Sequence, residues 1–120
     1  MAKIVLDTNF ILECIKNRVD FFEELLVRGH RILIPKEVIS EIKRLCDSSK
    51  ALRFKENATL ALRLLESEDF ELIDAPGRYV DKGIQKYCSL NPDVILATMD
   101  KELKRYNEKL FKWIFHLNFD

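Results

Sequence analysis

The segment KIVLDTNFILECI, residues 3–15, joins two apolar runs through the tripeptide Asp-Thr-Asn. The first run, residues 4–6, suits a buried β-strand. The second run, residues 10–15, has the spacing of a helix that packs back onto that strand. Asp7, the first polar residue between them, stands where helix N-caps are found. Capping alone therefore explains Asp7 unless the fold brings other acids to the same place.

The rest of the chain alternates short apolar runs with amphipathic segments. We expect further strands at residues 31–35, 70–74, 93–98 and 111–116, with helices at 10–16, 21–29, 36–46, 51–68 and 78–89 and a helical turn over 99–106. Strands that alternate with helices form a parallel sheet covered on both faces. The sequence therefore predicts one domain over residues 1–120. We expect a three-layer α/β/α fold around a mostly parallel sheet of about five strands.

Composition favours a compact soluble protein, with 48% hydrophobic and 33% charged residues. No apolar run approaches the roughly 20 residues that cross a bilayer, and the first strand leaves no room for a secretory signal. The three cysteines, Cys14, Cys46 and Cys88, lack a CxxC spacing and fall in apolar helical segments. Free thiols and a reducing, cytoplasmic location are therefore expected. The formal net charge of zero excludes a strong overall basic field but allows local basic patches.

Acidic residues stand where two predicted strands end. Asp7 follows the first strand and Asp100 follows residues 93–98. Ligand sites in open parallel sheets lie beyond the carboxyl ends of the strands, so these carboxylates should meet if their strands are neighbours. Glu41 and Asp81 border the apolar stripes of their helices. Two such charges about 4 Å apart repel by roughly 4 kcal/mol at an effective dielectric near 20, so converging acids need protons or a hard divalent cation.

Each acid also has a purely structural explanation. Capping explains the two acids that follow strands, a solvated helix face explains Glu41, and a favourable position at a helix N-terminus explains Asp81. Glu37 competes with Glu41 from one helical turn earlier. Asp93 comes before the apolar run that begins at residue 94, so we expect it in a turn at the opposite end of the sheet.

Four segments taken together resemble the PIN-domain family of metal-dependent ribonucleases. They are VLDTNFIL (5–12), IPKEVISEIKRL (34–45), YVDKGIQKYC (79–88) and VILATMDKELKR (94–105), and they span nearly the whole chain. The resemblance places the family's catalytic, metal-binding acids at Asp7, Glu41, Asp81 and Asp100, with Asn9 and Thr98 as accessory polar residues. Lys82 stands where the family often has a second adjacent acid, and that loss would weaken a second metal site.

The resemblance implies an endoribonuclease that hydrolyses phosphodiester bonds of single-stranded RNA with Mg²⁺ or Mn²⁺ as cofactor. The closing segment looks more like the rRNA-processing branch and its archaeal relatives than like typical toxins. The implied partners are RNA, a second copy in a homodimer, and either an antitoxin or a ribosome-assembly partner. Lys101, Lys104 and Arg105, beside Asp100, are candidate RNA contacts, as is the basic stretch over residues 41–55. A solvated face is the alternative for both stretches.

Two other functions compete with this one. A PIN-like module that binds RNA or a protein without cutting would show affinity but no products over any range of Mg²⁺ or Mn²⁺. An aspartyl phosphohydrolase needs paired acids after its first strand. The tripeptide that begins at Asp7 supplies a single acid, which disfavours that chemistry.

Overall fold

The protein is described by a computed structural model over residues 2–48 and 51–98. In chain order the elements of this part are β1 (Lys3–Leu6), α1 (Thr8–Lys16), α2 (Phe21–Val27), β2 (Arg31–Pro35), α3 (Lys36–Cys46), α4 (Leu52–Ser67), β3 (Glu71–Ile73), α5 (Val80–Leu90) and β4 (Val94–Ala97). The predicted turn over 99–106, the predicted strand over 111–116 and the candidate residues Asp100, Lys101, Lys104 and Arg105 lie outside the described residues.

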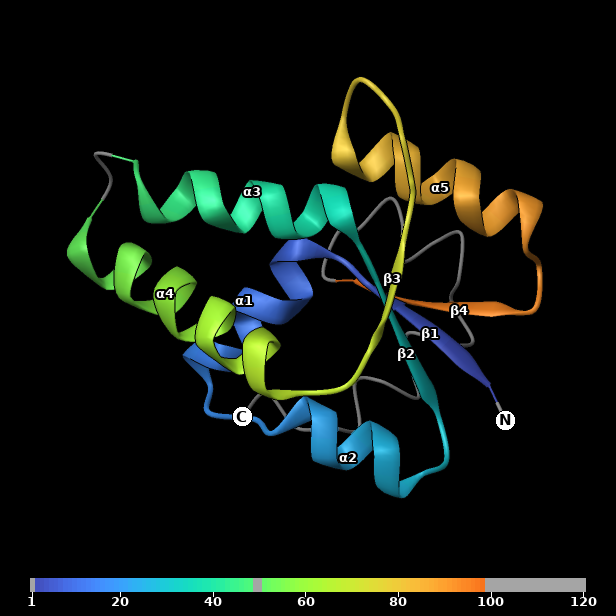
Figure 1. Ribbon diagram of the computed structural model, residues 1–120, viewed down its shortest axis with the longest axis horizontal. Helices are drawn as coiled ribbons and strands as arrows, with labels where there is room; N and C mark the ends of the chain where they lie inside the picture. The colour runs from blue at the N-terminus through green and yellow to red at the C-terminus, as the bar shows by residue number, and fades with distance from the viewer. Residues whose placement is uncertain (1, 49–50, 99–120) are drawn as a thin grey trace.

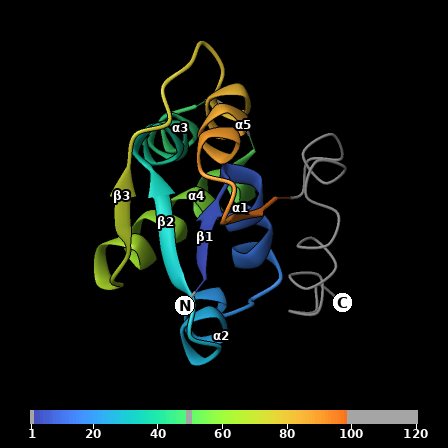
Figure 2. The same cartoon turned by 90° about the vertical axis from the view of Figure 1, so that its right-hand side faces the viewer.

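The strands form a parallel sheet in the order β3-β2-β1-β4. Figure 2 shows β3, β2 and β1 side by side with their arrowheads at the same end. Leu6 of β1 pairs with Ala97 of β4, so these two strands are neighbours, which is the condition for the residues that follow them to meet. The chain moves from β1 outward to β3 and then returns to the other side of β1, so the strand order reverses beside β1. Ligand sites in parallel sheets form at such a reversal, beyond the carboxyl ends of the strands.

Helices cover the sheet on both sides, as the three-layer prediction requires. Helices α1, α3 and α4 lie together on one side and α5 lies on the other (Figures 1 and 2). The side chains of Ile4, Val5 and Leu6 are fully buried between these layers. Such complete burial explains why β1 reads as a continuous apolar run rather than an alternating one. The fold prediction is confirmed, with four of the roughly five expected strands in the described part.

Local sequence signals set most element boundaries. Asp20 caps α2 by accepting a hydrogen bond from the Glu23 N–H at 3.1 Å. Gly29, just beyond α2, has a φ of +80°, a left-handed conformation that glycine adopts without strain. Helix α1 begins two residues earlier than expected, because Asp7 itself is the N-cap.

Two of the three cysteines are buried, and all three are free. Burial raises the pKa of the Cys88 thiol to about 11. Burial also raises the pKa of Cys14, with the nearby charges of Glu13 and Asp7 acting in the same direction. These thiols are protonated at neutral pH and serve as small apolar groups. No helix in the described part of the chain is long and apolar enough to cross a membrane.

Candidate active site

A pocket of about 270 Å³ lies beside the carboxyl end of β1. Its lining residues come from the β1–α1 junction, from α3 and from the start of α5: Asp7, Thr8, Asn9, Glu41, Tyr79, Val80, Asp81 and Ile84. Three of the four acids expected from the sequence therefore line one pocket. The fourth, Asp100, lies outside the described residues. We call this pocket the acidic pocket.

Asp7 is fixed at the junction by hydrogen bonds to its backbone and its side chain. Its N–H donates to the Ala97 carbonyl at 3.2 Å, which ties the end of β1 to the end of β4. One carboxylate oxygen, Oδ1, accepts from the Phe10 N–H at 2.7 Å, and the other, Oδ2, accepts from the Thr98 hydroxyl. The residue is only 6% exposed. Asp7 therefore caps α1 and lines the pocket at once, so the structural explanation and the functional one hold together.

The structure separates the two candidate acids of α3. Glu41 is half-buried and lines the acidic pocket. Glu37 lines a neighbouring cleft instead, where its Oε1 accepts a hydrogen bond from the Ala75 N–H at 3.0 Å. This bond anchors the loop that leads from β3 to α5. The two glutamates, one helical turn apart, therefore face different surroundings.

Asp81 lies in the first turn of α5 and is exposed at the pocket rim. Its Oδ1 accepts a hydrogen bond from the Lys82 N–H at 2.9 Å. Gly83, two residues later, allows this end of α5 to approach the preceding loop. A Cβ atom at Gly83 would stand 2.1 Å from the Ala75 carbonyl oxygen, closer than non-bonded atoms can come. The position of Asp81 thus depends on glycine at residue 83.

The accessory residues differ in their surroundings. Thr98 is 1% exposed and donates to Asp7, whereas Asn9 is exposed on the first turn of α1. Thr8, treated above only as a junction residue, lines the pocket with a buried hydroxyl that has no hydrogen-bond partner in the described part of the chain. Tyr79 also lines the pocket and was not predicted; its place just before α5 gave no sequence signal.

Asp93 lies away from this pocket, as its place before β4 suggested. It is exposed and directly precedes the first residue of β4, at the amino end of the strand. Thr98 directly follows the same strand at its carboxyl end. The alternative acid is therefore separated from the acidic pocket by the length of β4.

The lining of the pocket fits a hard divalent cation. Its donors in the described part are all oxygens, from carboxylates, an amide and hydroxyls, which is the set that Mg²⁺ and Mn²⁺ prefer. The unpartnered Thr8 hydroxyl adds a buried oxygen in need of a partner. No three Asp, Glu, His or Cys side chains within residues 2–48 and 51–98 form a group that could hold a metal ion. Mg²⁺ usually takes only one or two protein carboxylates and keeps several waters, so a magnesium site does not require three directly ligating acids.

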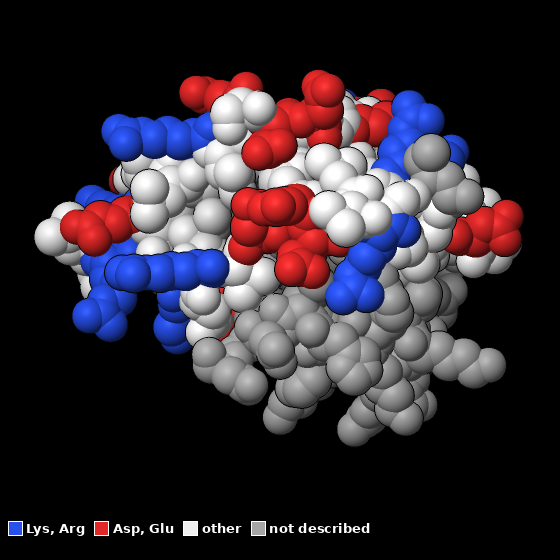
Figure 3. All heavy atoms as spheres, turned by 90° about the horizontal axis from the view of Figure 1, so that it is seen from below, with Lys and Arg blue, Asp and Glu red and all other residues white. Residues whose placement is uncertain are grey.

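The charge of the surface varies from face to face. Figure 3, seen from the side on which α2 lies, shows acidic side chains gathered near the middle of that face. Helix α2 and its N-cap supply three exposed acids, Asp20, Glu23 and Glu24. A polyanion would be repelled from such a group.

Comparisons of the sequence with known proteins identify the family. A family model described as a PIN-like domain matches residues 4–115. The chain is 36% identical to ribonuclease VapC4 of Methanocaldococcus jannaschii, over 93% of this chain and 85% of that protein. It is 30% identical to the rRNA-processing protein fcf1 of Schizosaccharomyces pombe, over 89% of this chain and 54% of that protein. Since the family model covers nearly the whole chain and its acid-bearing segments, the chain belongs to the PIN-like domain family.

Proposed function

We propose that this protein is a divalent-metal-dependent endoribonuclease, with Asp7, Glu41, Asp81 and Asp100 as its acidic residues. The observation that supports this most is the meeting of the first three in one pocket, although they lie 34 to 74 residues apart in the chain. A relative named as a ribonuclease, 36% identical over most of its length, supports RNA as the substrate.

The residues of the pocket have distinct roles in this proposal. Asp7, Glu41 and Asp81 would hold Mg²⁺ or Mn²⁺ directly or through water. The cation would supply Lewis-acid activation of a water and neutralise charge that develops on the phosphate. Thr98 orients the Asp7 carboxylate through its hydroxyl. Asn9 is exposed at the rim, where its amide can contact the sugar or phosphate of the strand.

The biological setting is proposed at a coarser level. The fission yeast relative is named for rRNA processing, and this supports a role in RNA processing. The chain spans only about half of that protein's length. The three free thiols support a reducing compartment such as the cytoplasm. The homodimer and the antitoxin or ribosome-assembly partner stay predictions from the family resemblance.

Replacing Asp7 with Asn tests the proposal. Asn is as good an N-cap as Asp, so Asp7→Asn should keep α1 and a cooperative unfolding transition while losing the charge that binds metal. We expect cleavage of a single-stranded RNA in Mg²⁺ or Mn²⁺ to fall at least a hundredfold. Asp20→Asn is the matched control, because Asp20 caps α2 in the same way outside the acidic pocket.

Two results would contradict the proposal. Full cleavage by the Asp7→Asn variant would remove Asp7 from the site. Binding of RNA by the unmodified protein, with no products across wide Mg²⁺ and Mn²⁺ titrations, would favour the non-catalytic module instead.

A further inference from the structure

A cleft of about 350 Å³ lies between α3 and the loop that joins β3 to α5. Its lining holds three cations and one acid: Lys36, Glu37, Ser40, Arg44, Gly77, Arg78 and Val80. This is the neighbouring cleft that contains Glu37, and we call it the basic cleft. Val80 also lines the acidic pocket, so the two hollows are adjacent. A strand bound at the acidic pocket can therefore reach the basic cleft.

The loop is held against α3 by two contacts. The half-buried Glu37 accepts a hydrogen bond from the Ala75 N–H at 3.0 Å. One residue earlier on each side, Nζ of Lys36 lies 2.9 Å from Oδ1 of Asp74. Figures 1 and 2 show the loop passing close to α3 before it enters α5. The anchored loop brings Arg78 to the same cleft as the side chains of α3.

Two guanidinium groups of the cleft have no acidic partner. Lys36 is paired with Asp74, and the carboxylate of Glu37 is engaged by the backbone of the loop. Arg44 and Arg78, in contrast, are exposed, and neither forms an ion pair within residues 2–48 and 51–98. The lining therefore carries more positive than negative charge and favours an anion.

The two arginines lie beside the residues that would bind the metal. Arg44 is three residues after Glu41 on α3, a rise of about 4.5 Å, and residues so spaced are neighbours on a helix surface. In the described part of the chain these two neighbours are not paired with each other. The guanidinium carbon of Arg78 lies 5.6 Å from the centroid of the Tyr79 ring, and Tyr79 lines the acidic pocket. Both cations therefore stand at the border between the two hollows.

We infer that the basic cleft binds a phosphate of the single-stranded RNA, the one next to the cleaved phosphate, through Arg44 and Arg78. This inference rests on the proposed function and specifies how its substrate is held. A guanidinium group presents N–H donors in a planar fork that matches phosphate oxygens, and the exposed Ser40 hydroxyl can donate a further hydrogen bond. The cations repel a metal ion, so the divalent cation stays in the acidic pocket while the cleft takes the flanking phosphate. Phosphate contacts fix position and carry no sequence information, so the cleft sets register rather than base preference.

Binding without turnover tests the inference. The affinity of a fluorescein-labelled oligouridine is measured by anisotropy in EDTA at several salt concentrations, so that loss of cleavage cannot account for a change. The double variant Arg44→Ala/Arg78→Ala should fold normally, because both side chains are exposed. Its plot of log affinity against log salt should be shallower by about 0.7, the loss of one phosphate contact on a single strand. At about 0.15 M salt this difference corresponds to an affinity about fourfold weaker.

Two further double variants separate a phosphate contact from general effects. Arg44→Lys/Arg78→Lys keeps both charges, so its salt slope should match that of the unmodified protein while its affinity falls through loss of the guanidinium forks. Arg63→Ala/Lys86→Ala removes two exposed cations that line neither hollow, and it should bind with unchanged affinity and slope. This last variant has the same net charge as the arginine-to-alanine variant, so the comparison controls for the overall field.

The outcomes distinguish this inference from the function it rests on. If Arg44→Ala/Arg78→Ala keeps the affinity and salt slope of the unmodified protein, the phosphate-binding role is wrong, even when the protein cleaves RNA. An equal loss in Arg63→Ala/Lys86→Ala would also overturn it, because the affinity would then follow net charge alone. If the unmodified protein shows no cleavage in Mg²⁺ or Mn²⁺ but the arginine-to-alanine variant loses RNA affinity as expected, the proposed catalysis is wrong and the basic cleft is retained.

Discussion

Replacing Thr98 with Val should weaken both the fold and the metal site through one lost hydrogen bond. The Thr98 hydroxyl donates to Oδ2 of Asp7, and the two residues are 1% and 6% exposed. Valine has nearly the same shape, so the substitution leaves no cavity and removes the hydroxyl that donates to Asp7. A hydrogen bond to a charged group contributes about 1.5–3 kcal/mol. We expect the free energy of unfolding to fall by about that amount.

The functional effect follows from the same bond. Groups that hydrogen-bond a metal ligand typically change metal affinity or activity by 10- to 100-fold when they are removed. We therefore expect Thr98→Val to raise the Mg²⁺ or Mn²⁺ concentration for half-maximal RNA cleavage by roughly 10- to 100-fold. The measurements are urea unfolding for stability and initial cleavage rates across a metal titration for the site.

Thr98→Ser is the matched control for this prediction. Serine keeps the hydroxyl and loses one buried methyl group, which costs about 1 kcal/mol. The metal dependence of Thr98→Ser should therefore stay close to that of the unmodified protein while its stability falls modestly. If the serine and valine variants show the same metal dependence, the hydroxyl does not orient Asp7 and the reasoning is refuted.

Two further predictions concern the elements that bring Asp81 and Glu41 to the pocket. Gly83→Ala should lower the free energy of unfolding by about 1–3 kcal/mol, because its Cβ would stand 2.1 Å from the Ala75 carbonyl oxygen. A stabilisation of about 1 kcal/mol in urea unfolding, the usual gain from Gly to Ala inside a helix, would contradict this. Glu41→Gln should reduce RNA cleavage at least tenfold. Glu37→Gln, with an amide oxygen that still accepts from the Ala75 N–H, should cleave normally; equal losses in a cleavage assay would refute the assignment.

The positions of the strands could be predicted because each strand is a local signal. The apolar runs of β1 and β4 are nearly continuous, as expected for strands covered on both faces. Asp7 follows β1 directly and Thr98 follows β4, so the parallel pairing of these strands brings the two residues to the same edge. This part of the candidate site could be predicted from the order of the elements and from the rule that ligand sites in parallel sheets lie beyond the carboxyl ends of the strands.

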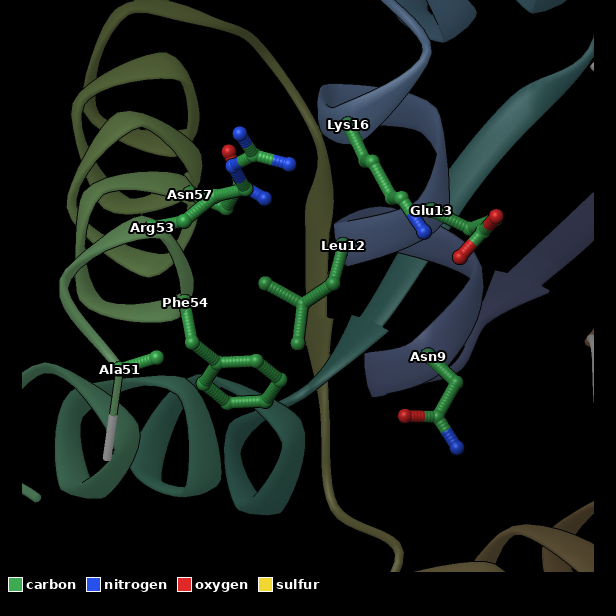
Figure 4. A pocket seen from close by; sticks show the side chains of 8 residues that line it. All are labelled: Asn9, Leu12, Glu13, Lys16, Ala51, Arg53, Phe54 and Asn57. Atoms are coloured by element: carbon green, nitrogen blue, oxygen red, sulfur yellow. The ribbon is translucent and has the colours of Figure 1, made fainter.

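The remaining features depend on contacts between distant segments. Glu37 and Glu41 are one turn apart and both border the apolar stripe of α3, so periodicity cannot choose between them. The choice depends on the Ala75 N–H, 38 residues from Glu37. The pocket between α1 and the start of α4 was not predicted for the same reason, because Leu12 and Phe54 line it together only when the two helices pack (Figure 4). Sequence signals place residues on elements, whereas the packing of those elements decides which residues share a pocket.

Asp7 both caps α1 and lines the acidic pocket, and its carboxylate has enough hydrogen-bonding capacity for both roles. Each carboxylate oxygen has two lone pairs, so Oδ1 can accept from the Phe10 N–H and Oδ2 from Thr98 while capacity for a cation remains. The N-terminus of α1 stabilises negative charge at this position, which offsets part of the cost of burying a carboxylate. The carboxylate is thus held in place by the ends of β1, α1 and β4 before any metal arrives. A preorganised ligand loses little conformational freedom on binding, and this is the physical reason to expect the first acid of the pocket at a helix cap.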